Sequence, residues 1–287
     1  MRRTALVLLA TAAVAYACGS TSRNEPPPGK PTADSTEGNG DAIADFLIHH
    51  RHHHHGGFLM LVTMSLDTLG LAPDERAGVE EIRSDLLAKM QPARAAELET
   101  VDLLATGIAQ SFIDKTRVDA AIVNLGNASA VLHDATVNDL NRLHELLTPA
   151  ERTALVEKTE SHWRLWQMAN NGSQSHVDAL SKEIGLTHSQ QEEVRKDFHA
   201  KAAASPMHES QVERHLRDFG RAFRGAHFDA RQLTDAAFAN RHMAEWGASR
   251  SALYCEVVNP VLTPEQRNRL VSILREHMTH DESQAGD

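Results

Sequence analysis

The 287-residue chain has only two cysteines, Cys18 and Cys255, and only 5% of its residues are aromatic. Two thiols cannot form the set of several disulfides that holds many small exported domains together. Basic residues are in the minority, 29 against 39 acidic ones, so the formal net charge is −10 at pH 7. A nucleic acid is therefore not expected as a partner of the chain as a whole.

Catalytic signatures are also missing. The sequence has no GxSxG, CxxC or HExxH motif and no phosphate-binding loop. Its nearest approach to the Glu-x-x-His motif of di-iron bundles is Glu160-Ser161-His162, in which the spacing is wrong. Strand patterns are almost absent as well. We therefore expect an all-α protein that is not an enzyme and requires no cofactor.

The one long apolar run lies at the N-terminus, from Ala5 to Ala17, behind two arginines. It is too short to span a bilayer and predicts an export signal over residues 1–17. An ordinary cleavage site could end at Ala17. Alternatively, Ala-Cys-Gly at residues 17–19 resembles a lipoprotein box in which Cys18 is acylated. Either way we expect a periplasmic protein, in the second case held to a membrane by lipid alone, with residues 18–57 as a flexible, His-rich tether.

A hexamer recurs at a fixed spacing along the chain. Leu71 opens LAPDER and Leu186 opens LTHSQQ, 115 positions later; Leu147 opens LTPAER and Leu262 opens LTPEQR, again 115 positions later. The two motifs in each half are also equally spaced, by 76 positions (147 − 71 and 262 − 186). Two spacings that agree to the residue indicate a tandem duplication.

Each hexamer has the design of a helix start. A threonine suits the N-cap, proline suits the first helical position, and Glu or Gln three residues after the threonine completes a capping box. LAPDER has alanine at the cap and should start its helix less firmly. The predicted capping residues are Thr148, Glu151, Thr187, Gln190, Thr263 and Gln266.

Apolar residues recur at intervals of three and four, which predicts amphipathic helices throughout the body. Breaks are expected at Gln91-Pro92, Gly107, Gly126, Pro149, Asn170-Asn171-Gly172, Ser205-Pro206, Gly225 and Pro260. They divide the body into two units of about four helices each, residues 58–168 and 169–287. Cys255 falls on an apolar helix face, where Leu140 is its counterpart in the first unit, so we expect it in the core.

Paired Leu-Thr-x-x-Gln motifs in an exported, all-helical chain resemble the Spy/CpxP family of periplasmic proteins, which has the metal-responsive relatives ZraP and CnrX. LTPEQR at 262–267 is the best match, and the resemblance covers about residues 58–168 and again 169–287. It implies hooked helical hairpins that pair into a cradle. It also implies ATP-independent holding of unfolded clients, or sensing of stress or metals. A tandem of two units could form that paired cradle within one chain, as an intramolecular pseudo-dimer.

A row of arginines in the second unit is the first candidate for client binding. Arg214, Arg217, Arg221 and Arg224 share one helical face beside the apolar residues Leu216, Phe219 and Phe223. Together they could hold unfolded segments, although a solvated face beside a buried stripe would have the same pattern. The positions 115 earlier include Glu99 and Asp102, so the two units could also attract each other through these charges.

The second candidate is the tract HHRHHHH, which comprises His49, His50, His52, His53, His54 and His55. Pairs at i, i+4 on a helix, or a flexible tract, could bind Zn, Cu or Ni. The tract has no counterpart in the second unit.

We therefore predict an exported holdase chaperone that binds unfolded envelope proteins on a helical cradle. The first alternative is a periplasmic heavy-metal sensor or buffer that uses the histidine tract. The second is an adaptor that binds the periplasmic domain of a sensor kinase of the envelope-stress response.

Overall fold

The computed structural model describes residues 55–171, 174–204, 207 and 209–279, and in this part of the chain every regular element is helical. The elements are α2 (Phe58–Asp67), α3 (Pro73–Ala109), α4 (Lys115–Ala130), α5 (Leu132–Leu146), α6 (Pro149–Asn171), α7 (Gln174–Ile184), α8 (His188–Ala202), α9 (Glu209–Arg224), η1 (Ala230–Gln232), α10 (Ala236–Val258), η2 (Asn259–Val261) and α11 (Pro264–Thr279). The predicted all-α class is confirmed.

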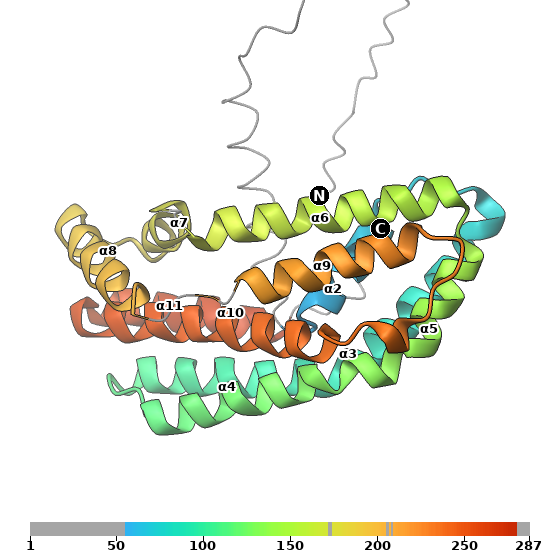
Figure 1. Cartoon of the computed structure of the whole chain (residues 1–287). Helices are drawn as coiled ribbons and strands as arrows, with labels where there is room; N and C mark the ends of the chain where they lie inside the picture. The colour runs from blue at the N-terminus through green and yellow to red at the C-terminus, as the bar shows by residue number, and fades with distance from the viewer. Residues whose placement is uncertain (1–54, 172–173, 205–206, 208, 280–287) are drawn as a thin grey trace, which may run out of the picture.

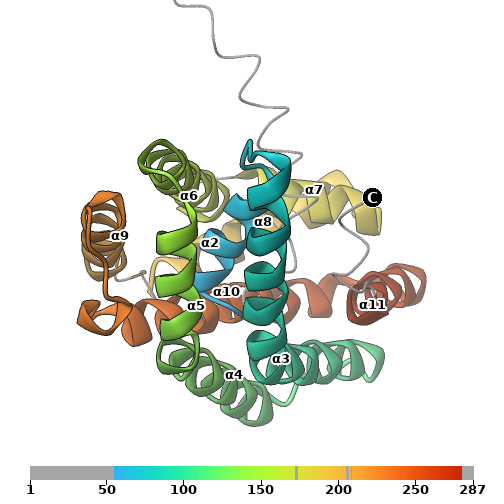
Figure 2. The same cartoon turned by 90° about the vertical axis from the view of Figure 1, so that its right-hand side faces the viewer.

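The helices form one elongated body with α2 and α10 inside it (Figures 1 and 2). α10 packs most extensively on α4 and also contacts α2, α3, α5, α8 and α9. Nearly every residue of α2 is buried, since its sequence FLMLVTMSLD is apolar on all sides. At its start Gly57 has a φ of 56°, and a Cβ there would come within 2.2 Å of the Asn240 carbonyl oxygen. Only glycine permits this approach of α2 to α10.

Helix boundaries recur at the spacing of the motifs. Pairs of boundaries 115 residues apart are the starts Pro73 and His188, Lys115 and Ala230, Pro149 and Pro264, and the ends Ala109 and Arg224, Leu146 and Val261. Helix ends ordinarily vary by one or two residues even between close copies, so this agreement is what an internal duplication would produce.

The two halves contact each other along their whole length. α3 packs on α11 and α9 packs on α6, while α4 and α5 both pack on α10. The last helix of each half, α6 or α11, therefore packs on a helix of the other half, α9 or α3. The division into two units of hooked hairpins stays a prediction, and its boundary at residue 168 falls inside α6, which continues to Asn171.

Three of the predicted details need correction. α3 continues through Pro92, which lies on the exposed side of the helix; there the Ala88 carbonyl that loses its backbone partner can face water. α4 likewise continues past Gly126, where the backbone comes close to the Glu245 side chain of α10. The tether was expected to reach residue 57, but His55, Gly56 and Gly57 are buried. The export signal and Cys18 lie outside the described residues.

Cys255 is 2% exposed, as expected for a core residue. Burial raises the pKa of its thiol to about 12, so the sulfur stays protonated and unreactive at neutral pH.

Candidate functional site

The arginine row of α9 is exposed, but each arginine has an acidic partner. Arg214 lies 3.8 Å from Asp235, Arg217 3.9 Å from Glu213, Arg221 2.7 Å from Asp218 and Arg224 3.2 Å from Glu160. Pairs of this kind at a surface contribute little stability, and they reduce the net positive charge that the row presents. The row is thus a mixed-charge face of the helix.

The apolar residues beside that row are in the core. Phe219 and Phe223 are fully buried and Leu216 is 7% exposed, so the prediction that these three side chains bind clients is wrong in this fold. The ring of Phe219 lies 5.3 Å from that of Phe58 in α2 and 5.1 Å from that of Phe223. The amphipathic pattern of α9 reflects packing against α6 and α10 and against Phe58 of α2, which is the commoner meaning of such a pattern.

The expected attraction between the arginines and the acidic residues Glu99 and Asp102 is also not what joins the halves. The contact of this row with the first half is instead made by Arg224 with Glu160 of α6. Glu99 and Asp102 lie on α3, whose neighbours in the other half are α11 and α10.

Only the last histidine of the predicted metal tract lies within the described residues. His55 is 1% exposed, and its Nδ1 donates to the Glu97 carboxylate at 2.9 Å. That carboxylate also accepts from Arg94 at 2.8 Å. His55 is therefore a buried structural residue and is removed from the candidate metal ligands. His49, His50, His52, His53 and His54 lie outside the described residues, where metal binding stays a prediction. Within the described ranges, no group of three or more His, Cys, Asp or Glu side chains could hold a metal ion.

Both hexamers of the second half cap their helices and also bind each other. Thr187 and Gln190 form a complete capping box at the start of α8, and Thr263 and Gln266 exchange the same two bonds at α11. The amides of Gln190 and Gln266 then pair, at 2.9 and 3.0 Å. Their nitrogens also donate to the carbonyls of Val261 and Gly185. We call this junction of α8 and α11 the glutamine clasp.

The first half has the same junction with different chemistry. Thr148 and Glu151 form the capping box of α6, with bonds of 2.8 and 3.4 Å, and Glu75 accepts from the Ala72 backbone at α3. Glu75 and Glu151 are the counterparts of Gln190 and Gln266, and their carboxyls lie within hydrogen-bonding range of each other. We call this junction of α3 and α6 the glutamate clasp.

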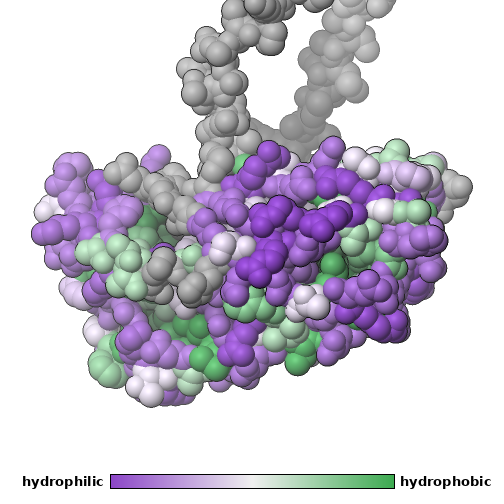
Figure 3. All heavy atoms as spheres, in the orientation of Figure 1, coloured by the Kyte–Doolittle hydropathy of each residue, from purple (hydrophilic) through white to green (hydrophobic). Residues whose placement is uncertain are grey.

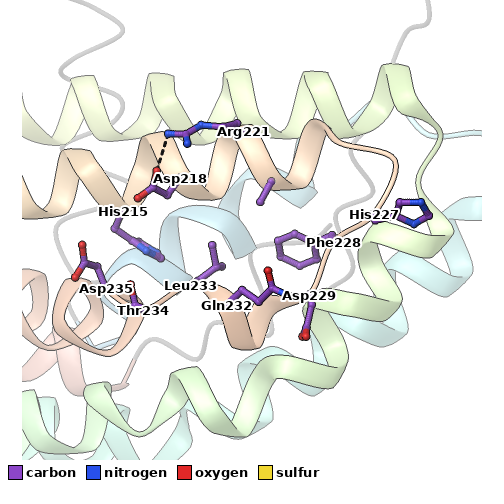
Figure 4. Close-up of a pocket in the computed structure, with 11 residues that line it drawn as sticks. His215, Asp218, Arg221, His227, Phe228, Asp229, Gln232, Leu233, Thr234 and Asp235 are labelled. Carbon is purple, nitrogen blue, oxygen red and sulfur yellow. Dashed lines mark hydrogen bonds and ion pairs between the residues drawn. The ribbon is translucent and has the colours of Figure 1, made fainter.

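A cavity of about 270 Å³ lies between α9 and the segment around η1 (Figure 4). His215 points from α9 toward Leu233 and Thr234 on the far side of the cavity, and Asp218, Arg221 and Asp235 supply charge around it. Each of these carboxylates is paired with an exposed arginine, Asp218 with Arg221 and Asp235 with Arg214. At the positions of His215, Asp218 and Arg221 the first half has Thr100, Leu103 and Thr106, so the polar lining belongs to the second half alone.

His215 is the unusual group of that cavity. It is 1% exposed, and its Nδ1 has no hydrogen-bond partner among the described residues. Burial, together with the nearby His133 and against the attraction of Asp218, lowers its pKa to about 4. The imidazole is therefore neutral at pH 7.

This burial predicts a loss of stability in acid. Between the usual histidine pKa of about 6.5 and the folded value of about 4, the unfolded chain binds a proton that the folded chain does not. The contribution of His215 is thus complete above pH 6.5 and falls by about 3 kcal/mol as the pH approaches 4. His215→Phe, which keeps a ring against Phe58, should reduce the difference in free energy of unfolding between pH 7.5 and 4.5 by about 2.5 kcal/mol. Urea denaturation at both values measures it, with the exposed His188→Ala as the control; an unchanged difference would contradict the neutral, buried state.

A different surface carries the exposed apolar side chains. The large hydrophobic residues that are exposed in the described part of the chain are Phe112, Val123 and Val131, at 68%, 48% and 62%. Phe112 lies just before α4, Val123 lies on it and Val131 ends it. The first turn of α4 also exposes the charged residues Lys115, Arg117 and Asp119. The uncharged exposed residues of the helix are Thr116, Ala120, Asn124 and Asn127, and residues 120–132 contain no charged side chain. We call Phe112, Val123 and Val131, with these four residues, the α4 face.

The α4 face lies along the lower edge of the body. Apolar residues gather in that part of the surface, over α4 and α10 (Figures 1 and 3). In a chain of which 24% is charged, the uncharged stretch of residues 120–132 suits contact with apolar groups of another molecule. The sequence analysis missed this surface, although the uncharged run was a visible signal.

Comparison with protein-family models, with curated proteins and with solved structures found no match. Among the described helices, none combines the length and the apolar character that crossing a membrane would require.

Proposed function

We propose that this protein is an exported, ATP-independent holdase that binds unfolded polypeptides on the α4 face. The observation that carries the proposal is that the exposed large apolar side chains of the described residues all lie on α4 or next to one of its ends. Isolated apolar side chains, with small uncharged residues between Val123 and Val131, offer weak and sequence-tolerant sites for the apolar side chains of an extended segment. The similarity of the LTxxQ motifs to those of the Spy/CpxP family supports the same function.

The proposal moves client binding from α9 to the first half of the chain. The net charge of −10 fits clients that are basic as well as apolar, because a negatively charged body attracts them over a longer range. No nucleotide is required, since capture depends only on the affinity of an exposed surface for apolar segments.

The first test is suppression of aggregation. A chemically denatured client is diluted into buffer that contains purified residues 19–287, without ATP, and light scattering is followed. We expect suppression at a molar ratio near one. Val123→Asp combined with Val131→Asp should remove most of it, because two carboxylates would then have to be desolvated for each apolar contact.

The matched control is Asn124→Asp combined with Asn127→Asp. It adds the same charge to the same helix face but removes no apolar side chain. Retained suppression in this control and loss in the valine variant would assign capture to the apolar residues, whereas equal behaviour of the two variants would contradict the α4 face as the binding surface. Suppression only with added zinc would favour the metal-binding alternative, and binding to one folded partner but not to unfolded clients would favour the adaptor.

A further inference from the structure

The glutamine clasp shows what the junction between two capped helices needs. Each amide of Gln190 and Gln266 uses its oxygen to accept from the other amide and from the start of its own helix, and its nitrogen to donate across the junction. The nitrogens also satisfy the backbone carbonyls of Val261 and Gly185 at 2.6 and 2.8 Å. Every bond across the junction therefore requires a donor at the end of each side chain.

The glutamate clasp cannot supply such donors at neutral pH. Ionised carboxylates only accept hydrogen bonds, and two of them within bonding range repel each other. Both carboxyls nevertheless keep the capping part of their role, since Glu75 accepts from the Ala72 backbone and Glu151 accepts from the Thr148 backbone and hydroxyl. The part that an ionised pair loses is the bond from one side chain to the other.

We propose that Glu75 and Glu151 form a proton-dependent clasp, which joins the starts of α3 and α6 when the two carboxyls share one proton and loosens them when both are ionised. This clasp and the glutamine clasp lie at opposite ends of the body, the first at the right and the second at the left in Figure 1. One end is thus closed at any pH and the other closes as the pH falls. The proposal does not depend on the proposed function.

The shared proton resides on Glu75. The hydrogen bond from the Thr148 hydroxyl lowers the pKa of Glu151 most, burial opposes it, and the bonds from the Thr148 backbone and from Glu75 lower it further. Glu151 therefore remains the acceptor, and Glu75 is the partner that can be protonated and donate.

The charged groups around the pair do not replace that proton. On α3, Arg76 donates to the Leu71 carbonyl at 3.4 Å, and on α6, Arg152 donates to the His144 carbonyl of α5 at 3.3 Å. Lys158, about two turns further along α6, donates to Thr68 after α2. Asp67, the last residue of α2, is paired with Arg83 of α3.

The sign of the pH dependence follows from proton binding. The closed clasp holds one more proton than the open one, so closing is favoured as the pH falls from 7 toward the usual glutamate pKa of about 4.3. Below that range Glu151 is protonated as well and its bonds from Thr148 weaken. The clasp should therefore be most closed near pH 4 to 5.

Hydrogen exchange of four matched amides tests the proposal in the full-length chain. Arg76 and Arg152 donate the first backbone bonds of α3 and α6, and Gln191 and Arg267 do so in α8 and α11. Their protection factors, corrected for intrinsic exchange, are compared at pH 7.5 and pH 5. We expect roughly tenfold more protection at pH 5 for Arg76 and Arg152, as gained from one charge-assisted bond, and less than twofold change for the other two.

Two reciprocal substitutions provide the controls. Glu75→Gln places an amide donor opposite Glu151, so the protection of Arg76 and Arg152 at pH 7.5 should rise to the value measured at pH 5 and lose its pH dependence. Gln190→Glu combined with Gln266→Glu should give the glutamine clasp the pH dependence that the glutamate clasp has in the unmodified protein. Equal pH dependence at both ends in the unmodified protein, or a pH dependence that survives Glu75→Gln, would overturn the proposal.

Discussion

Phe219→Ala is expected to lower the free energy of unfolding by about 3–5 kcal/mol, which is the usual cost of removing a large aromatic side chain from a core. Phe219 is fully buried and touches the rings of Phe58, Phe223 and Phe228 at centroid distances of 5.3, 5.1 and 6.2 Å. These contacts hold α9 against α2 and against the segment before η1. The alanine variant would leave a cavity at the meeting point of three segments, and urea denaturation measures its cost.

The same variant separates the two meanings of the apolar stripe on α9. A core residue affects stability, whereas an exposed client-binding residue affects capture of clients and leaves the denaturation midpoint unchanged. Arg217→Ala, on the exposed side of the same helix, is the matched control and should change the free energy of unfolding by less than about 0.5 kcal/mol. If Phe219→Ala were as stable as the unmodified protein and lost client binding, the burial described for α9 would be contradicted.

Helix starts were the part of the fold that the sequence predicted best. The hexamers predict starts at Pro149, His188 and Pro264 because a capping residue followed by an N3 acceptor satisfies the first backbone N–H groups in almost any context. This is a local signal, and it depends on a few consecutive residues. The weak LAPDER cap also starts its helix, α3, without a side-chain cap, because the packing of α3 on α4, α5 and α11 makes up for the missing hydroxyl.

The helix breaks predicted at Pro92 and Gly126 are wrong, because at these positions tertiary packing outweighs the local preference of the residue. Proline and glycine raise the free energy of a helix locally, but Pro92 and Gly126 lie in long helices that are fixed on either side by the core. In the second half the segment that corresponds to α3 is divided into α8 and α9. Tertiary contacts therefore determine which of two nearly equivalent segments remains one helix.

Whether the residues predicted on α9 form a binding site depends on which other helices cover them, and a periodic sequence pattern does not contain that information. The stripe of Leu216, Phe219 and Phe223 shows which residues share a face, but not whether another helix covers that face. The pairing of α9 with α6 and of α3 with α11 exchanges partners between distant halves of the chain, and no local signal specifies it. The glutamate clasp, by contrast, could have been predicted, because Glu75 and Glu151 occupy the positions of Gln190 and Gln266 in the duplicated register.

Glu97→Ala is expected to be as costly as the loss of Phe219, about 3–5 kcal/mol, for an electrostatic reason. Glu97 is 5% exposed and accepts hydrogen bonds from His55 and Arg94, at 2.9 and 2.8 Å. Removing one partner of a buried charged group leaves the other desolvated without compensation, and that penalty exceeds what the intact pair contributes. The exposed Glu99→Ala, two residues further along α3, removes the same group from water and should have almost no effect.

The position of the His55–Glu97 pair determines how the loss of stability in Glu97→Ala would appear in a denaturation curve. His55 lies immediately before α2, and its carbonyl accepts from the Ser129 hydroxyl of α4 at 2.7 Å, so the same residue ties the N-terminal segment to two helices. Release of this anchor alone would be a local event, but α2 occupies the interior and cannot leave without exposing the faces of α6 and α10 that cover it. We therefore expect one cooperative transition, with a lower midpoint and an unchanged dependence on urea concentration. A second, earlier transition in Glu97→Ala would show instead that α2 and the N-terminal segment unfold separately from the rest of the body.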